Sequence, residues 1–295
     1  MKCFTKHILS LLLPWAVIVL PAACGIVEDG SMCVQYAVVP KPVTKAGEAL
    51  PDTLTGGMKA YLFIDGRFSR TVEPERDGRY LISFDGRGKA SVVFFAARKA
   101  DTATVRTPAE GERMEATAVK AGGAARAGTE AQDSLSGIYY GRYDYESAAG
   151  DGNIQISVPV SNRCARIRVV LKRVAEYYGK TDGYTLSISG LRGSLTYDGT
   201  VTGDSVVYTP PATFDVEGRL CTTPLTVLPN AEGEHITLTL YKDGRMLWQS
   251  GVDQDRKPVT LSAGDDVVMI ADVERNDMFI QVMTWQQYKQ DTVIY

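Results

Sequence analysis

Histidine is nearly absent from this sequence. It occurs twice in 295 residues, and only His235 lies beyond residue 23. A histidine-based triad needs a nucleophile and a carboxylate that converge on the ring, yet no Gly-x-Ser-x-Gly elbow occurs. Closely spaced His and Cys pairs, from which zinc sites are built, are also missing beyond residue 23. We therefore expect no enzyme, no catalytic or metal-binding residues and no cofactor, with His235 on the surface. Glycoside hydrolysis by paired carboxylates stays open, because their separation in space cannot be read from the sequence.

A basic stripe is missing as well. The chain has 32 Lys and Arg residues against 35 Asp and Glu, a formal net charge of -3, and the two signs are intermixed. Proteins that bind nucleic acid carry positive charge gathered on one face or along one segment. Nucleic acid is therefore excluded as a partner.

No apolar run is long enough to span a bilayer. The longest occupies residues 8–20, at most about 16 residues where a membrane helix needs roughly 20. Lys2 and Lys6 precede the run, and small residues lead from it into Cys24. This layout is typical of a secretory signal peptide covering residues 1–23.

The small residues before Cys24 resemble a bacterial lipobox, which predicts cleavage between Ala23 and Cys24 and acylation of the cysteine. Each buried methylene contributes about 0.8 kcal/mol, so two or more chains hold a protein firmly on a membrane. Residues 24–34 would then be a lipidated leader. Within it, Glu28 and Asp29 resemble an acidic tag for export to the cell surface. The alternative to the lipobox is an ordinary signal peptide followed by an incidental cysteine. The alternative to the export tag is a pair of solvated charges without a targeting role.

Disulfides contribute little to the expected fold. Of five cysteines, Cys3 leaves with the signal peptide and Cys24 takes the lipid, so Cys33, Cys164 and Cys221 remain. An odd number allows at most one disulfide. Cys164 and Cys221 lie in strand-like runs and either pair with each other or stay as buried thiols.

The first half of the mature chain predicts antiparallel strands over residues 58–64, 67–72, 79–84, 89–97 and 135–145. Asp-Gly dipeptides separate several of these runs, and Asp-Gly between apolar runs is a strong hairpin signal. Residues 107–134 instead are rich in Ala, Gly, Glu and Arg, which predicts a mobile excursion with a short helix around residues 112–120. We assign residues 35–150 to an N-terminal β-sandwich that includes this excursion.

The second half alternates apolar and polar residues with period two, which indicates sheets with one buried face. The strands that we expect cover residues 153–160, 164–175, 184–189, 205–209, 235–241, 246–249, 259–261, 267–273 and 278–285. Residues 151–295 are therefore assigned to a C-terminal β-sandwich. The fold class is all-β, with two antiparallel sandwiches in series.

Aromatic residues could serve either a core or a ligand. Tyr139, Tyr143 and Tyr145 share one strand face while Tyr140 points to the other, so we expect a core or a domain interface. Exposed aromatic rings would instead form a platform for sugars, which keeps a surface glycan-binding lipoprotein as an alternative.

Several segments together resemble the fimbrium anchoring subunits of Bacteroidales. They are the lipobox, the second leader cysteine Cys33, and residues 61–66 (YLFIDG), 139–141 (YYG), 170–173 (VLKR) and 280–285 (IQVMTW). The resemblance implies two transthyretin-like sandwiches, a lipid tether in the outer membrane and a place at the base of a surface fimbrium, whose length the protein would limit. The implied partners are the fimbrial stalk subunit and the membrane.

Strand addition between subunits is also implied by this resemblance, with backbone pairing as the source of affinity. We expect the tail, residues 286–295, to pair as a strand with the stalk subunit through Tyr288, Thr292, Val293, Ile294 and Tyr295. A terminal edge strand or a frayed end is the alternative. A stalk or tip pilin, trimmed near its first strand at an arginine or lysine, remains a further alternative for the whole chain.

Overall fold

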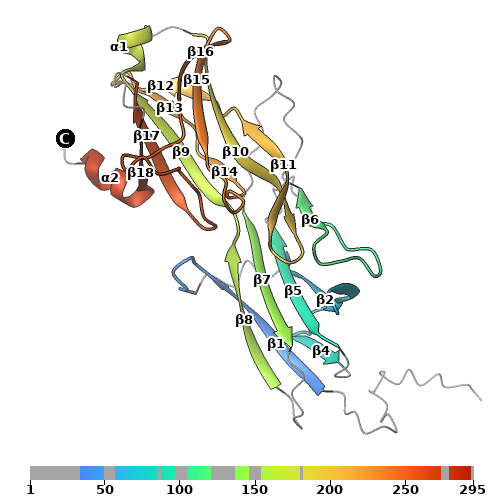
Figure 1. The fold of residues 1–295 in the computed structure, drawn as a ribbon. Coiled ribbons are helices and arrows are strands. Elements are labelled where there is room, and N and C mark those ends of the chain that lie inside the picture. The colour runs from blue at the N-terminus through green and yellow to red at the C-terminus, as the bar shows by residue number, and fades with distance from the viewer. Residues whose placement is uncertain are drawn as a thin grey trace, which may run out of the picture.

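The computed structural model describes residues 34–49, 57–84, 88–97, 105–120, 137–145, 154–179, 182–273 and 279–293. These residues form strands in three sheets with two short helices, α1 (Val174–Tyr178) and α2 (Trp285–Val293) (Figure 1). The all-β prediction is confirmed. The signal peptide, the Ala23–Cys24 cleavage site, Glu28, Asp29 and Cys33 lie outside the described residues, as do Ile294 and Tyr295.

The first unit is a seven-stranded sheet in the order β3-β2-β5-β7-β8-β1-β4. Its strands are β1 (Val34–Val43), β2 (Lys59–Ile64), β3 (Arg67–Val72), β4 (Tyr80–Phe84), β5 (Ala90–Ala97), β7 (Ile138–Tyr145) and β8 (Ile154–Asn162). The predicted β2–β3 hairpin is present. Asp65 and Gly66 at its turn have φ of 48° and 72°, as a primed turn requires.

The central strands of this sheet are buried on both faces. On one face, Leu62, Val92 and Phe94 pack into a core that strands from both ends of the sheet complete. On the other face, their neighbours Phe63 and Phe95 enter a second core. Burial on both faces explains why these strands read as continuous apolar runs rather than as an alternating pattern.

Strand pairing in this sheet differs from the expected meander. β4 pairs with β1 instead of β5, and β1 runs parallel to β8. The Asp-Gly signal after β4 was therefore wrong as a hairpin indicator, because local turn chemistry does not determine which distant strand completes a sheet. β8 also pairs with β7, so the change from one sheet to the next follows Asn162 and does not coincide with the predicted boundary at residue 150.

The second unit consists of two sheets that face each other across an apolar core. One contains β6 (Thr117–Lys120), β10 (Tyr184–Thr196), β11 (Val201–Tyr208), β15 (Thr237–Lys242) and β16 (Arg245–Ser250). The other contains β9 (Ala165–Lys172), β12 (Ala212–Phe214), β13 (Leu220–Thr222), β14 (Leu225–Val227), β17 (Asp266–Asp272) and β18 (Ile280–Thr284). The predicted inward faces are confirmed: Ile167, Val169 and Leu171 meet Leu238 and Leu240 in one core.

Three details of the second unit depart from the expected strands. β9 stops at Lys172 because Arg173 adopts a left-handed conformation (φ 61°) and α1 follows. Residues 259–261 form no regular strand, although Val259 and Leu261 are buried. β9 and β17 run parallel, so this sheet, like the first, is mixed rather than purely antiparallel.

The described part of the predicted excursion, residues 107–120, is ordered into the fold. The short helix expected around residues 112–120 is wrong: the segment turns and ends in β6, which pairs with β10 of the second unit. Met114, Ala118 and Val119 are buried. A four-residue strand gives too short a pattern to recognise, and tertiary pairing overrides the helix propensity of Ala116 and Ala118.

An aromatic core joins the two units. Phe95 and Tyr140 of the first sheet lie 5.2 Å apart between ring centroids, and Tyr197, just after β10, lies 5.6 Å from Phe63. Tyr197 donates a hydrogen bond to the carbonyl of Arg106 (2.7 Å). At Gly199 (φ 86°) a Cβ would come within 2.7 Å of the Tyr140 ring, so this close approach requires glycine. We call this cluster the junction core.

Candidate functional site

The predicted partner strand is a helix over the part of the tail that the structure describes. Residues 285–293 form α2, with the side chains of residues 291–293 outside the description. Thr284 and Gln287 cap the helix reciprocally: the Gln287 side chain accepts from the Thr284 N–H (2.9 Å), and Thr284 Oγ1 accepts from the Gln287 N–H (3.3 Å). Thr-x-x-Gln is a capping box, and this signal could have identified the helix from the sequence.

α2 covers the outer face of the sheet that contains β9 and β17 (Figure 1). Val170, Val268 and Ile270 point outward there, and Trp285 and Tyr288 pack against them. A central strand with apolar residues on both faces requires such a cover. We call this contact the α2 cover.

Trp285 is fixed by a cation–π contact at the base of the α2 cover. The guanidinium carbon of Arg168 lies 3.7 Å from the Trp285 ring centroid. Arg168 also forms an ion pair with Asp266 at 2.9 Å. Trp285 in turn stacks on Tyr288 with a centroid distance of 5.5 Å. Among the described side chains of α2, those of the first turn, Trp285 and Tyr288, therefore make the apolar contact with the sheet.

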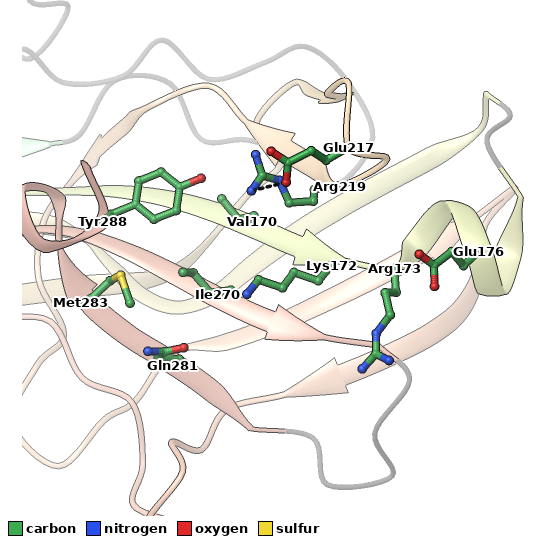
Figure 2. Close-up of a pocket in the computed structure, with 10 residues that line it drawn as sticks. All are labelled: Val170, Lys172, Arg173, Glu176, Glu217, Arg219, Ile270, Gln281, Met283 and Tyr288. Carbon is green, nitrogen blue, oxygen red and sulfur yellow. Dashed lines mark ion pairs between the residues drawn. The ribbon is translucent and has the colours of Figure 1, made fainter. Parts of the chain in front are cut away.

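A groove of about 570 Å³ opens beside α2. Figure 2 shows Val170 and Ile270 between two groups of side chains: Tyr288 and Met283 on one side, and charged residues at the start of α1 and in the β12–β13 turn on the other. Its full lining is Val170, Lys172, Arg173, Glu176, Glu217, Arg219, Ile270, Gln281, Met283 and Tyr288. An apolar floor with a charged rim is suited to binding a protein segment.

Most charges on the rim of this groove are already paired. Arg219 contacts Asp215 at 2.6 Å and Glu217 at 2.9 Å. Arg173 donates through Nε to Asp272 at 2.8 Å. Among the described residues, Lys172 forms no ion pair, so its ammonium group is available to a partner carboxylate.

Cys221, which packs against the apolar residues under the α2 cover, has a thiol of low reactivity. Burial, followed by the charge of Asp215, raises the pKa of the Cys221 thiol to about 11, so little thiolate forms near neutral pH. Cys164 lies in the junction core. Both residues are free thiols, so of the two alternatives left open by the sequence, the Cys164–Cys221 disulfide is not formed.

The tyrosine cluster serves packing, as its parity predicted. Tyr139, Tyr143 and Tyr145 belong to the core of the first unit, whereas Tyr140 enters the junction core. Trp248 is also buried, at 4% exposure. These rings offer no exposed platform for sugars.

A second hollow, of about 660 Å³, lies between the first sheet and Met114, Glu115 and Asp198, and both polar and apolar side chains line it. Asp144 accepts hydrogen bonds from Ser91 (2.6 Å) and Arg142 (2.7 Å), and Asp65 accepts from the Lys89 N–H (2.8 Å). No group of three or more His, Cys, Asp or Glu side chains positioned to hold a metal occurs within the described ranges. His235 is exposed, as expected. Among the residues that the structure describes, no helix is long and apolar enough to cross a membrane.

Comparison with known proteins agrees with this geometry. The family model for fimbrillin-A associated anchor proteins Mfa1 and Mfa2 matches residues 44–291. The fimbrial anchor protein Mfa2 from Porphyromonas gingivalis has a similar structure, with a TM-score of 0.62 at 15% identity over 86% of this chain and 98% of that one. A search of curated proteins found no match.

Two further structures share the fold. A candidate adhesin from Bacteroides thetaiotaomicron has a TM-score of 0.56 at 16% identity, covering 86% of this chain and 97% of that one. A candidate polysaccharide-binding protein from the same species has a TM-score of 0.56 at 14% identity, covering 81% and 91%. The family match spans most of the sequence, and the chain belongs to the fimbrillin-A associated anchor protein family.

Proposed function

We propose that this protein is a lipid-anchored outer-membrane subunit that forms the base of a surface fimbrium, holds its stalk subunit and limits its length. Membership of the fimbrillin-associated anchor family is the observation that carries the proposal. A base subunit that binds the stalk at one end and the membrane at the other adds no further site for elongation, so it ends the polymer.

The lipid tether is supported by the leader. Acyl chains on Cys24 would hold the mature amino terminus at the outer membrane, and Glu28 and Asp29 would direct the protein to the cell surface. β1 begins at Val34, so the tether would lead within ten residues (34 − 24) into the sheet of the first unit.

An intact first strand favours the anchor over a trimmed stalk or tip pilin. No lysine or arginine occurs between Cys24 and Lys41, and Lys41 already lies inside β1. The next residue is Pro42, and a Lys–Pro bond is a poor substrate for trypsin-like proteases because its nitrogen is locked in the proline ring. No basic residue before β1 is therefore available for trimming. The next basic residue after Lys41 is Lys45, which follows β1, so trimming there would remove the whole strand together with Cys24.

The junction core supports a load-bearing role. Aromatic rings from both units interlock there, and β6 adds backbone pairing to β10. A filament pulled from outside would transmit force through this contact to the tethered end.

We propose that the tail pairs with the stalk subunit only after it converts from the helix α2 to an extended strand. α2 would leave the sheet, and residues 286–295 would then pair as an extended strand with the stalk subunit. Tyr288, Thr292 and Ile294 would lie on one face of this strand, and Val293 and Tyr295 on the other. The short helix and its dependence on the first turn support this conversion. Truncation after Asp291 tests it, because Trp285 and Tyr288 remain. Detached or overlong fimbriae are expected, and attached fimbriae of normal length would remove the tail from the proposal.

Replacing Cys24 tests the function as a whole. In cells that carry Cys24→Ala, we expect the protein and its filaments in the medium, whereas Cys33→Ala, which leaves the lipobox intact, should keep both on the cell. Filaments that stay attached and of normal length in the Cys24→Ala strain would contradict the proposal. Retention of the wild-type protein on a polysaccharide column without any stalk protein would favour the glycan-binding alternative.

A further inference from the structure

Three exposed apolar side chains belong to adjoining elements at one end of the second unit. Val216 is 98% exposed, Met246 56% and Tyr177 49%, and they are the most exposed large hydrophobic residues of the described chain. Val216 lies in the β12–β13 turn, Met246 near the start of β16 and Tyr177 in α1. Single exposed apolar residues need no explanation, but a group on adjoining elements marks an interaction surface.

Contacts among the three elements hold this group together. The Lys242 ammonium donates to the carbonyl of Tyr178 at 2.7 Å, which ties the β15–β16 hairpin to α1. A Cβ at Gly218 would lie 3.4 Å from that of Ala175, so the β12–β13 turn abuts α1 on its other side. The three side chains therefore project from one packed platform, which we call the tip patch.

The tip patch is at the end of the molecule opposite the start of β1. In Figure 1, α1 and the β15–β16 hairpin are at the top, whereas β1 and β8 begin at the bottom. If Cys24 fixes the amino terminus to the membrane, the tip patch faces away from the cell. The groove beside α2 opens next to it, since Glu176 and Glu217 of the groove rim directly precede Tyr177 and follow Val216 in the sequence.

We propose that the tip patch is the docking surface for the stalk subunit. Tyr177, Val216 and Met246 would supply the apolar centre of the interface, and the charged groove rim would supply its polar surround, the arrangement found in protein–protein interfaces. The partner is a protein with an apolar surface complementary to these three side chains. This inference rests on the proposed function, because the stalk identifies the partner and the lipid tether sets the orientation.

The test measures how well the immobilised mature protein, with acylated Cys24, captures fimbriae sheared from the same cells. The tip variant combines Tyr177→Ser, Val216→Ser and Met246→Ser. A matched control replaces the other exposed apolar residues of the described chain, Ile154, Val207 and Val282, by serine. All six side chains are exposed, so both variants should fold, which circular dichroism and thermal unfolding verify.

Loss of at least ~30-fold in affinity for the tip variant, with less than threefold loss for the control, is the expected result, since truncating hot-spot residues has effects of this size. Unchanged capture by the tip variant, or equal loss in both variants, would overturn the docking assignment and leave the anchor function intact. No capture by the wild type would overturn the anchor function itself. A wild-type dimer that only the tip variant dissolves, with capture unchanged, would assign the patch to a second copy of the chain.

Discussion

The junction core and the α2 cover are both apolar contacts, yet they are built differently. The junction core draws rings from β2, β5 and β7 together with Tyr197 and β6, and its large side chains, such as Tyr61 and Phe95, are fully buried. The α2 cover rests on three sheet residues and on partly exposed side chains of one short helix. One contact joins distant parts of the chain, and the other is made by its last segment.

This difference predicts that opening the junction core costs much more free energy than releasing α2. Opening the junction core would expose several aromatic side chains at once, each stabilised by about 1.5 to 3 kcal/mol when buried. Releasing α2 would expose mainly Val170, Val268 and Ile270. Local opening follows the least buried contacts, so α2 should open long before the molecule unfolds.

Of the substitutions that test this comparison, Tyr197→Ala should lower the free energy of unfolding most. The side chain is fully buried, and its hydroxyl donates to the Arg106 carbonyl. Removing a buried ring of this size costs about 3 to 5 kcal/mol. Chemical denaturation should show this loss, with Tyr177→Ala, which removes an exposed tyrosine, close to wild type. A loss below about 1 kcal/mol would show that the junction core contributes little to stability.

Trp285→Ala should have a smaller and more local effect. It removes the cation–π contact with Arg168 and the stack on Tyr288, a loss of about 1 to 3 kcal/mol. Hydrogen exchange should accelerate in α2 while the junction strands keep their protection. Gln286→Ala, an exposed neighbour in the same turn, is the control. Equal acceleration in both regions would mean that the two contacts open together.

Thr284→Ala tests the cap alone. The variant removes the hydroxyl that accepts from the Gln287 N–H, and loss of such a cap costs about 1 kcal/mol. Exchange of the first α2 amides should speed up several-fold. If it does not, the capping box is not what starts the helix.

Acid should slightly weaken the folded state through Glu112, which lies in the segment of residues 105–120. Hydrogen bonds from Arg106, opposed by desolvation, hold the pKa of Glu112 below its ordinary value of 4.5. A lowered carboxyl pKa stabilises the folded state above pH 4.5, and this contribution is lost as the pH falls through the folded pKa. Glu112→Gln should therefore reduce the loss of stability between neutral pH and pH 3 in a series of denaturation curves. The same acid dependence in both proteins would exclude Glu112 as a cause.

Local patterns in the sequence predicted most strands but not their partners. β2, β3, β15 and β16 follow from apolar runs around Asp-Gly turns, and both hairpins are present. Three pairings join residues that are far apart in the chain: β4 with β1, β1 with β8 and β9 with β17. Long-range pairing depends on how much apolar surface the whole sheet buries, and this cannot be predicted from the sequence of a single segment.

The tail shows the same limit at the candidate site. From the sequence, we predict a partner strand for residues 286–295, whereas Thr284 and Gln287 form a capping box that starts a helix. Outward-facing Val170 and Ile270 were visible in the alternation of β9 and β17 and indicated that something must cover them. The groove itself could not be predicted, because it depends on how α1, α2 and the β12–β13 turn meet.

The most direct test of the account is the mass of the amino-terminal peptide from protein that remains with purified, cell-attached fimbriae, combined with immunogold labelling of the same filaments. The account predicts a peptide that begins with acylated Cys24 and label confined to the base of each filament. An amino terminus within or beyond β1, or label along the filament shaft, would contradict it.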